Sequence, residues 1–492
     1  MGIPYYFYYL TKKYHNIIVR ELPKKINIYA IDFNGIIHPE AAKETNEEQL
    51  IINLWNKINH YNELYKPNKL IICIDGVAPF AKIIQQRKRR YLTFYKNKID
   101  KIVSKWDTNA ISPGTKFMDK LDEYIIKNNK NNKNKYIFSG SNEEGEGEHK
   151  IFKIINDIYL DKDEHEEESI IINGLDADLI ILSLISGKKN IYLMRENREQ
   201  LTYINIDNLK LAIINELESK WCIENKIDLI ESYCVMCSIL GNDFIPHILN
   251  LNIKSGGLDK LINITEIAIR ANGSLVEDNK INQKTLTEIF NLIAENEDNE
   301  IIELINKEIE KKPRDFTLKS QEFAIKNKDP VLFDMYNNSK KWRYYYYKKL
   351  FDININSDSA YISNASNNYI KGIYWTYNYY KKFDLDYTWY YPYNYPPTVK
   401  DISNYLKVNI IELIKLSGKY LQPKYQLLLI LPIHSIQLVD ESLQKYMTDV
   451  SSGLKYLYPT EYKIQTLFKN HLWECCPILP MINIEKIIKI NN

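Results

Sequence analysis

Three apolar, strand-like runs in the first half of the chain each end in aspartate, and this pattern restricts the possible folds most. The runs are INIYAIDFNGIIH, KLIICIDGVAP and ESIIINGLDADLIIL, and their acids are Asp32, Asp75, Asp176 and Asp178. Helix-like segments separate them, and NIYLMRE adds a fourth strand. Buried strands separated by helices predict an α/β fold with a mainly parallel sheet flanked by helices. Ligands bind such sheets beyond the carboxyl ends of the strands, where these acids lie.

Further acids lie in loops. GSNEEGEGEHKIF contains Glu146 and Glu148, and CSILGNDFIPH contains Asp243, where an apolar run breaks at a glycine. Crowded carboxylates repel one another unless a proton or a cation joins them, so the first loop is either a solvated acidic loop or half of a metal site. A single aspartate of this kind is more often a helix cap or a turn residue.

As a set, these acids favour a metal site. Oxygen ligands at this density suit Mg²⁺ or Mn²⁺ rather than zinc. Two such ions can hold the attacking water and the leaving oxygen of a phosphodiester. The candidate metal-binding and catalytic residues are Asp32, Asp75, Glu146, Glu148, Asp176, Asp178 and Asp243.

A basic helical segment, FAKIIQQRKRRYLTFYKNKIDK, begins shortly after Asp75. Lys82, Gln86 and Arg89 are spaced i, i+4 and i+7, so they form one stripe, which Arg90 flanks. Arginine forks and a lysine charge on one stripe can bind a phosphate. The alternative is a solvated basic face.

Histidines and aromatic residues give weaker signals. His38 could contact a base or a phosphate, and His149 could contact the acids or the start of a helix, although a structural histidine explains either one. The aromatic residues of 373–395 are either a packed core or a wall on which bases stack, with Trp375 and Trp389 as candidates for contact with a nucleic acid.

The bulk properties exclude some classes of protein. The net charge of +2 over 492 residues gives no overall attraction to nucleic acid. Cys234 and Cys237 form a CxxC without a second pair, which favours buried thiols over zinc. No signal peptide and no apolar run of about 18 residues occur, so we expect an intracellular protein outside the membrane. Changes in composition predict a first, α/β domain at 1–262, a connecting segment at 263–328 and a second region at 329–492.

Together these motifs resemble the Xrn family of 5′→3′ exoribonucleases. The blocks that carry the resemblance occur in the family's order: MGIPYYFYYLTKKY with Gly2 and Pro4, IDFNGIIH, DGVAPFAKIIQQRKRRY, ISPGTKFM, GEGEHKI, GLDADLIIL, LMRE and LGNDFIPH…GGLDKL. YIKGIYWTYNYY…WYYPYNYPP and YPTEYKI…LWECCPILPMI resemble its second conserved region. The resemblance therefore covers essentially the whole chain.

The resemblance implies a nuclease fold of the PIN or flap type with a second, mostly helical, aromatic-rich region. It assigns the seven acids to a divalent-metal site, Lys82, Gln86, Arg89 and Arg90 to a pocket for a 5′-monophosphate, and His38 to the first base. It further implies processive degradation of single-stranded RNA with a 5′-monophosphate to mononucleotides. We also expect a monomer, and a location in the cytoplasm rather than in the nucleus.

Some features depart from the family pattern. Phe80 stands where the family usually has arginine, and His15 where it tends to have proline. The chain ends where the second conserved region ends, so we expect a compact member without the β-rich domains of larger relatives. Two alternatives stay open: a flap-type nuclease acting on DNA, and a catalytically inactive RNA-binding scaffold. The blocks near the carboxyl end argue against the first, and the complete set of acids argues against the second.

Overall fold

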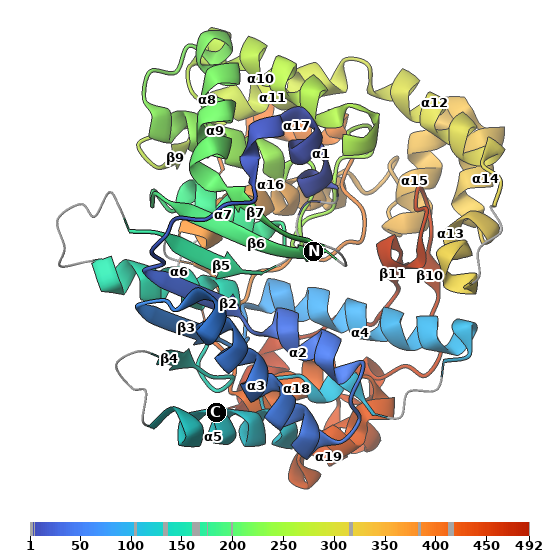
Figure 1. Ribbon diagram of the computed structural model, residues 1–492. Helices are drawn as coiled ribbons and strands as arrows, with labels where there is room; N and C mark the ends of the chain where they lie inside the picture. Colours follow the sequence, from blue (N-terminus) through green and yellow to red (C-terminus); the bar gives the residue numbers. More distant parts are fainter. Residues whose placement is uncertain are drawn as a thin grey trace.

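A twisted sheet forms the centre of the computed structural model, which describes residues 3, 5–102, 106–130, 136–159, 168–174, 176–197, 200–313, 318–381, 385–411 and 418–491. Gly2 and Pro4 of the opening motif lie outside the described residues. Among those described, the sheet has seven strands in the order β1-β7-β6-β5-β2-β3-β4 (Figure 1). These strands are β1 (Ile18–Val19), β2 (Ile28–Asp32), β3 (Lys69–Cys73), β4 (Tyr136–Ser139), β5 (Ile170–Asn173), β6 (Ile191–Asn197) and β7 (Gln200–Asn205).

Strands β4, β3, β2, β5 and β6 are parallel, whereas β7 and β1 continue the sheet in antiparallel pairing. Asp32 at the end of β2 pairs with Cys73 at the end of β3, and Cys73 pairs with Ser139 of β4. On the other side, Ile31 pairs with Asn173 of β5. The carboxyl ends of these strands therefore meet at one edge, and the predicted mainly parallel sheet is confirmed.

Alternate residues of β2 face different helical layers, as the pleat of a strand requires. Ile28 and Ala30 belong to a core shared with α6 (Gly147–Tyr159), α7 (Asp178–Ile185), α8 (Ile206–Trp221) and α9 (Lys226–Ser238). Tyr29 and Ile31 belong to a core shared with α2 (Asn34–Ala41), α3 (Glu47–Tyr65) and α5 (Lys116–Asn129). Helices thus cover both faces of the sheet, which explains why its strands are apolar throughout.

Helix α4 (Phe80–Asp100) leaves the edge of the sheet and runs toward the second half of the chain (Figure 1). Its first residue, Phe80, is only 2% exposed and packs edge-on against Tyr390, with ring centroids 5.2 Å apart. The same core contains the apolar residues of α18 (Pro423–Ile430). Phenylalanine at this position therefore contacts the second half of the chain, and its apolar character has a structural role.

The remaining helices surround the far end of the sheet and α4 (Figure 1). They are α10 (Gly257–Asn272), α11 (Gln283–Ala294), α12 (Glu297–Glu310), α13 (Phe323–Lys326), α14 (Pro330–Asn337), α15 (Trp342–Leu350), α16 (Ser359–Lys381), α17 (Val399–Val408), α19 (Glu441–Thr448) and α20 (Ile484–Asn491). Two short hairpins complete the description: β8 (Val276–Glu277) with β9 (Lys280–Ile281), and β10 (Ile464–Gln465) with β11 (Cys476–Pro477).

Of the two domain boundaries predicted from the sequence, one falls inside a helix and the other falls just before one. Residue 262 lies inside α10, and α10 and α11 share the core of α8 and α9, so the expected connecting segment is partly continuous with the core on that face of the sheet. Residue 329, in contrast, precedes α14, whose N-cap is the Asp329 side chain. Cys234 and Cys237 lie buried in α9, and burial raises the pKa of both thiols. Among the described residues, no helix has the length and apolar character needed to cross a bilayer.

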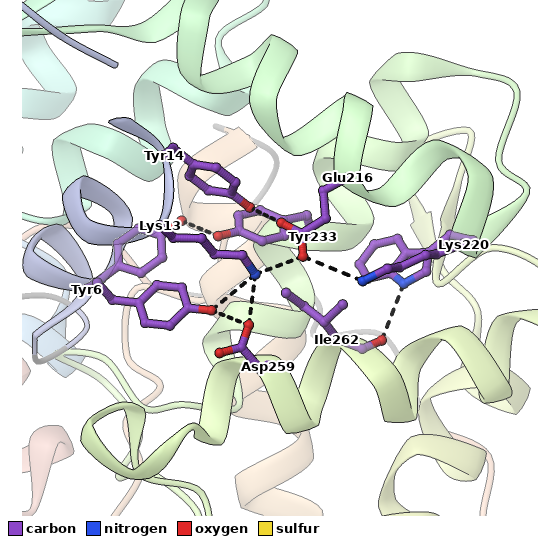
Figure 2. A network of polar contacts seen from close by, with 10 residues as sticks. Tyr6, Lys13, Tyr14, Glu216, Lys220, Tyr233, Asp259 and Ile262 are labelled. Atoms are coloured by element: carbon purple, nitrogen blue, oxygen red, sulfur yellow. Dashed lines mark hydrogen bonds and ion pairs between the residues drawn. The ribbon is translucent and has the colours of Figure 1, made fainter. Parts of the chain in front are cut away.

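The first helix, α1 (Tyr6–Lys13), is fixed to α8 and α10 by the polar network in Figure 2. The Lys13 ammonium forms ion pairs with Glu216 at 2.7 Å and Asp259 at 2.8 Å. Tyr14 donates to Glu216 at 2.5 Å, and Tyr6 donates to the Tyr233 hydroxyl of α9 at 3.0 Å. One lysine thus joins three helices that lie far apart in sequence.

Lys13→Met should therefore lower the free energy of unfolding by up to about 1 kcal/mol, because half-buried Glu216 loses its closer cation and keeps only Lys220, while Asp259 is exposed. Lys12→Met is the matched control, since Lys12 is exposed on the same helix. Urea unfolding followed by circular dichroism measures the difference. Equal midpoints for the two variants would show that the network contributes nothing to stability.

Candidate active site

The acids singled out in the sequence come together at the carboxyl edge of the sheet. Asp32 ends β2, Asp75 follows β3, and Glu146 and Glu148 flank the first residue of α6. Asp176 follows β5, and Asp178 is the first residue of α7. Asp243 arrives from the loop after α9. Parallel strands with aligned ends bring the first six near one another, whereas the packing of α9 on α7 brings the seventh.

Gly147 keeps two of the acids close to the start of α6. Its backbone N–H donates to Asp75 Oδ1 at 2.7 Å. A Cβ atom at this position would lie 2.9 Å from Asp32 Oδ1, 3.2 Å from the Cys73 carbonyl oxygen and 3.3 Å from Asp75 Oδ1. Glycine is therefore required here by close approach of the helix to the ends of β2 and β3.

Burial and mutual repulsion disfavour the charged forms of these acids. Burial, followed by the neighbouring Asp75 and Asp176 carboxylates, raises the pKa of Asp32 well above its ordinary value. Burial and the Asp178 carboxylate do the same for the pKa of Glu148. The pKa of Asp178 rises to about 7 because of its burial and of nearby Asp243. Such a cluster binds protons or cations readily.

Three buried carboxylate oxygens of this acidic cluster have no hydrogen-bond partner among the residues that the structure describes. They are Asp32 Oδ1, Glu148 Oε2 and Asp178 Oδ1. Buried polar atoms are otherwise nearly always paired, so oxygens of this kind need an explanation such as an ion. In addition, Glu146, Glu148 and His149 can bring one ligand atom each to within 4.8 Å of one another. An oxygen-rich donor set of this kind fits a hard divalent cation such as Mg²⁺ or Mn²⁺.

Lys82 belongs to the acidic cluster in this structure. Its buried ammonium forms ion pairs with Glu146 and, at 2.8 Å, with Asp243. Burial opposes the charge on Asp243, but the Lys82 ammonium outweighs that effect and lowers the pKa of the carboxyl. The sequence pointed to this lysine as part of the phosphate stripe, and the structure places it at the point where the stripe meets the acids.

The other residues of the stripe lie farther along α4. Arg89 is exposed and Gln86 is half-buried. Arg90 donates from Nη2 to Ser112 Oγ at 2.6 Å. Partial desolvation and, after it, the charges of Arg89 and Arg90 lower the pKa of His38 to about 4, so the imidazole is neutral and lies within electrostatic range of both arginines although its side chain is exposed. The structure thus brings the predicted histidine of α2 to the predicted basic stripe.

Trp375 does not reach a solvent-facing surface in this structure. It is 0% exposed, donates from Nε1 to the Asp386 carbonyl at 2.8 Å and packs between Phe244 and Trp389. The expectation that it contacts RNA is therefore corrected: this indole is a core residue of α16, and Trp389 is also buried.

The next turn of α16 supplies contacts that the sequence did not reveal. Tyr379 donates to Glu146 at 2.5 Å and stacks near His149, with ring centroids 4.0 Å apart. Tyr380 forms a hydrogen bond with Asp178. The available signal was the spacing of Trp375 and Tyr379, which are one helical turn apart and share a face, but the pattern did not show which ring would meet the acids.

Family comparisons agree with this arrangement over most of the chain. A family described as XRN 5'-3' exonuclease N-terminus matches residues 1–197. A family described as Xrn1 helical domain matches residues 221–341 and 338–491.

This chain belongs to the XRN family. It is 27% identical to the human protein named 5'-3' exoribonuclease 1, over 99% of this chain and 34% of that protein. It is 24% identical to 5'-3' exoribonuclease 1 of Saccharomyces cerevisiae over 99% of this chain and 43% of that protein. The chain spans less than half the length of these two relatives, but 70% of the Drosophila melanogaster 5'-3' exoribonuclease 2 homolog.

Solved structures overlap this XRN family chain in part. The catalytic core of Rad2 in complex with a DNA substrate is 14% identical, with a TM-score of 0.34 over 68% of this chain and 85% of that one. The T5 D15 protein co-crystallized with metal ions is 12% identical, with a TM-score of 0.30 over 54% of this chain and 83% of that one.

The close contact at Gly147 leads to a prediction for this XRN family site. Gly147→Ala should lower the free energy of unfolding by about 1–3 kcal/mol, because the new methyl group displaces Asp32 and the start of α6. Gly35→Ala is the control, since Gly35 lies in α2 with no atom within 4 Å of an added Cβ, and alanine favours a helix by up to about 1 kcal/mol. Denaturant unfolding of both variants decides whether the contact is as tight as described.

Proposed function

We propose that this chain is a metal-dependent 5′→3′ exoribonuclease that degrades single-stranded RNA from a 5′-monophosphate end, processively, to mononucleotides. The observation that carries the proposal is the buried cluster of carboxylates at the sheet edge, with three oxygens that have no partner among the described residues. Membership of the XRN family and the names of the relatives support the same reaction and the same polarity.

The cluster fits a divalent cation through its own residues. Asp32, Glu148 and Asp178 offer the unsatisfied oxygens and would hold the ion or ions. When bound, two such ions polarise a phosphodiester and lower the pKa of water. Gly147 orients Asp75 through its backbone N–H, while Tyr379 fixes the rotamer of Glu146.

Lys82 has a second task at the acids. By pairing with Glu146 and Asp243, it neutralises part of the cluster without filling the place of the unsatisfied oxygens on Asp32, Glu148 and Asp178. An anionic phosphate then approaches a less negative surface than the number of acids suggests. The side chain also connects the acids to the helix that carries the arginines.

The 5′ end is selected, in this proposal, by the part of α4 that faces His38. Arg89 and Arg90 offer forks of N–H donors that match a phosphate, and Gln86 adds an amide one turn earlier. His38 is neutral beside them, so its ring is available for contact with the first base.

The decisive experiment measures decay of RNAs with capped, triphosphate, monophosphate and hydroxyl 5′ ends, with and without Mg²⁺. Asp178→Ala should reduce decay of the monophosphate RNA more than about 100-fold, because a carboxylate that holds the cation is lost. Asp157→Ala, an exposed acid at the other end of α6, is the control. Unchanged decay in the Asp178 variant, or decay that is unaffected by EDTA, would refute the proposal, and preferential cleavage of flap DNA would favour the rival nuclease.

Replacing Arg89 and Arg90 together by alanine should abolish the preference for a monophosphate over a hydroxyl 5′ end, because both forks are removed. The measurement is the ratio of initial rates on the two RNAs. Lys96→Ala is the control, as Lys96 is an exposed cation on the same helix. If both rates fall by the same factor, the arginines anchor RNA generally and do not read its end.

A further inference from the structure

A cavity of about 470 Å³ lies along α4, and most of its lining has no part in the proposed reaction. The loop after α9 and the segments 390–394 and 468–477 close it, and Lys88, Asn242 and Lys469 are among its polar lining. Asp243 of the acidic cluster and Arg89 of the basic stripe both line this cavity. Its volume lies within the range of about 300–1,000 Å³ that is usual for small-ligand sites.

The geometry of α4 separates this cavity from the group that faces the 5′ end. Ala81, Gln85, Lys88 and Leu92 line it, at the spacing i, i+4, i+7 and i+11 of one helix face. Gln85 lines the cavity, whereas the side chain of Gln86, the next residue, leaves the helix axis in a direction about 100° away. Arg90 points instead toward Ser112. Only Arg89, whose charge reaches both His38 and Asp243, borders both sides.

The polar groups of the cavity suit an anion. Lys88 and Lys469 form no ion pair with a carboxylate in the part of the chain that the structure describes. Asn242 Nδ2, an N–H donor, is buried without a hydrogen bond to any described residue, whereas the unpaired Gln85 Oε1 is an acceptor and suits an N–H or O–H group of a ligand. The two acids of the wall are engaged elsewhere: Asp243 with Lys82, and Glu474 with the backbone N–H groups of Asn470 and His471.

The apolar part of the cavity wall is aromatic. Tyr390, Tyr393, Phe468 and Trp473 line it. Trp473 is 48% exposed, beside Tyr5 with ring centroids 6.4 Å apart, so an indole face lies at the rim. Aromatic rings beside unpaired cations are the arrangement with which proteins bind a base and its phosphate without reading the sequence.

We propose that this cavity binds one nucleotide unit, with its phosphate at Lys88 and Lys469 and its base against the aromatic wall. The source of that nucleotide rests on the proposed function: either the mononucleotide just released or the next nucleotide of the strand. Both carry the same chemistry, and Arg89 lies where either one would pass from the acids.

The binding test uses adenosine 5′-monophosphate, titrated into the full chain in EDTA and followed by calorimetry. Lys88→Gln and Lys469→Gln should each weaken binding about tenfold, as expected for the loss of one charge-assisted contact. Trp473→Leu, at the exposed rim, should weaken it by a similar factor through lost stacking. Lys96→Gln, on an exposed face of the same helix, should bind as the unaltered chain does.

The proposal is overturned if adenosine 5′-monophosphate shows no saturable binding, or if the Lys469, Trp473 and Lys96 variants bind it equally. Because Lys88 is the more buried lysine, the Lys469 and Trp473 variants keep the test valid if Lys88→Gln does not fold. Binding that is lost only in Arg90→Gln would also overturn it, since the nucleotide would then occupy the other face of α4. None of these readouts requires catalysis, so a chain that binds the nucleotide but leaves RNA intact would refute only the proposed function.

Turnover experiments distinguish the two sources. If the cavity holds the released product, Lys469→Gln raises about tenfold the concentration of adenosine 5′-monophosphate that halves RNA decay, and it affects short and long RNAs equally. If it holds the strand, the variant slows decay of a long RNA more than that of a trinucleotide. A variant that changes neither quantity contradicts the proposal.

Discussion

The confinement of many carboxylates at one buried edge of a sheet is the constraint on which the rest of the structure depends. Burial, and after it the neighbouring carboxylates, raise the pKa values of Asp32, Glu148 and Asp178 and so disfavour their charged forms. Lys82 offsets part of that repulsion through two ion pairs. The backbone N–H of Gly147 and the Tyr379 hydroxyl provide further stabilisation. The surrounding helices are positioned to deliver these few groups.

The site is consequently built from both halves of the chain. The sheet and α6 provide most of the acids, α4 provides the cation, and α16 provides the tyrosines that touch Glu146 and Asp178. Phe80 anchors the start of α4 among residues of α18 and the segment around Tyr390. The arginines proposed to bind phosphate, the lysine that pairs with the acids and the cavity therefore all lie along one helix, α4.

Much of this could be predicted from the sequence. Apolar strands separated by helices predict a parallel sheet, and aligned parallel strands bring their carboxyl ends to one edge. The sheet and the proximity of Asp32, Asp75 and Asp176 could therefore be predicted. The basic stripe on α4 was also visible from its spacing. Helical spacing shows which side chains share a face but not what that face meets. The packing of α4 and α16 decides that Lys82 pairs with the acids, that Trp375 lies in the core and that Tyr379 contacts Glu146. This packing depends on residues far away in the sequence, so the local pattern does not show it.

The contact between Tyr379 and Glu146 joins residues 233 positions apart. During synthesis on the ribosome, the acids of the sheet emerge long before α16, so the sheet can form while the tyrosines that brace its acidic edge are still missing. The assembled site thus arises only after Tyr379 has left the exit tunnel. The long sequence separation delays maturation of the site relative to folding of its scaffold.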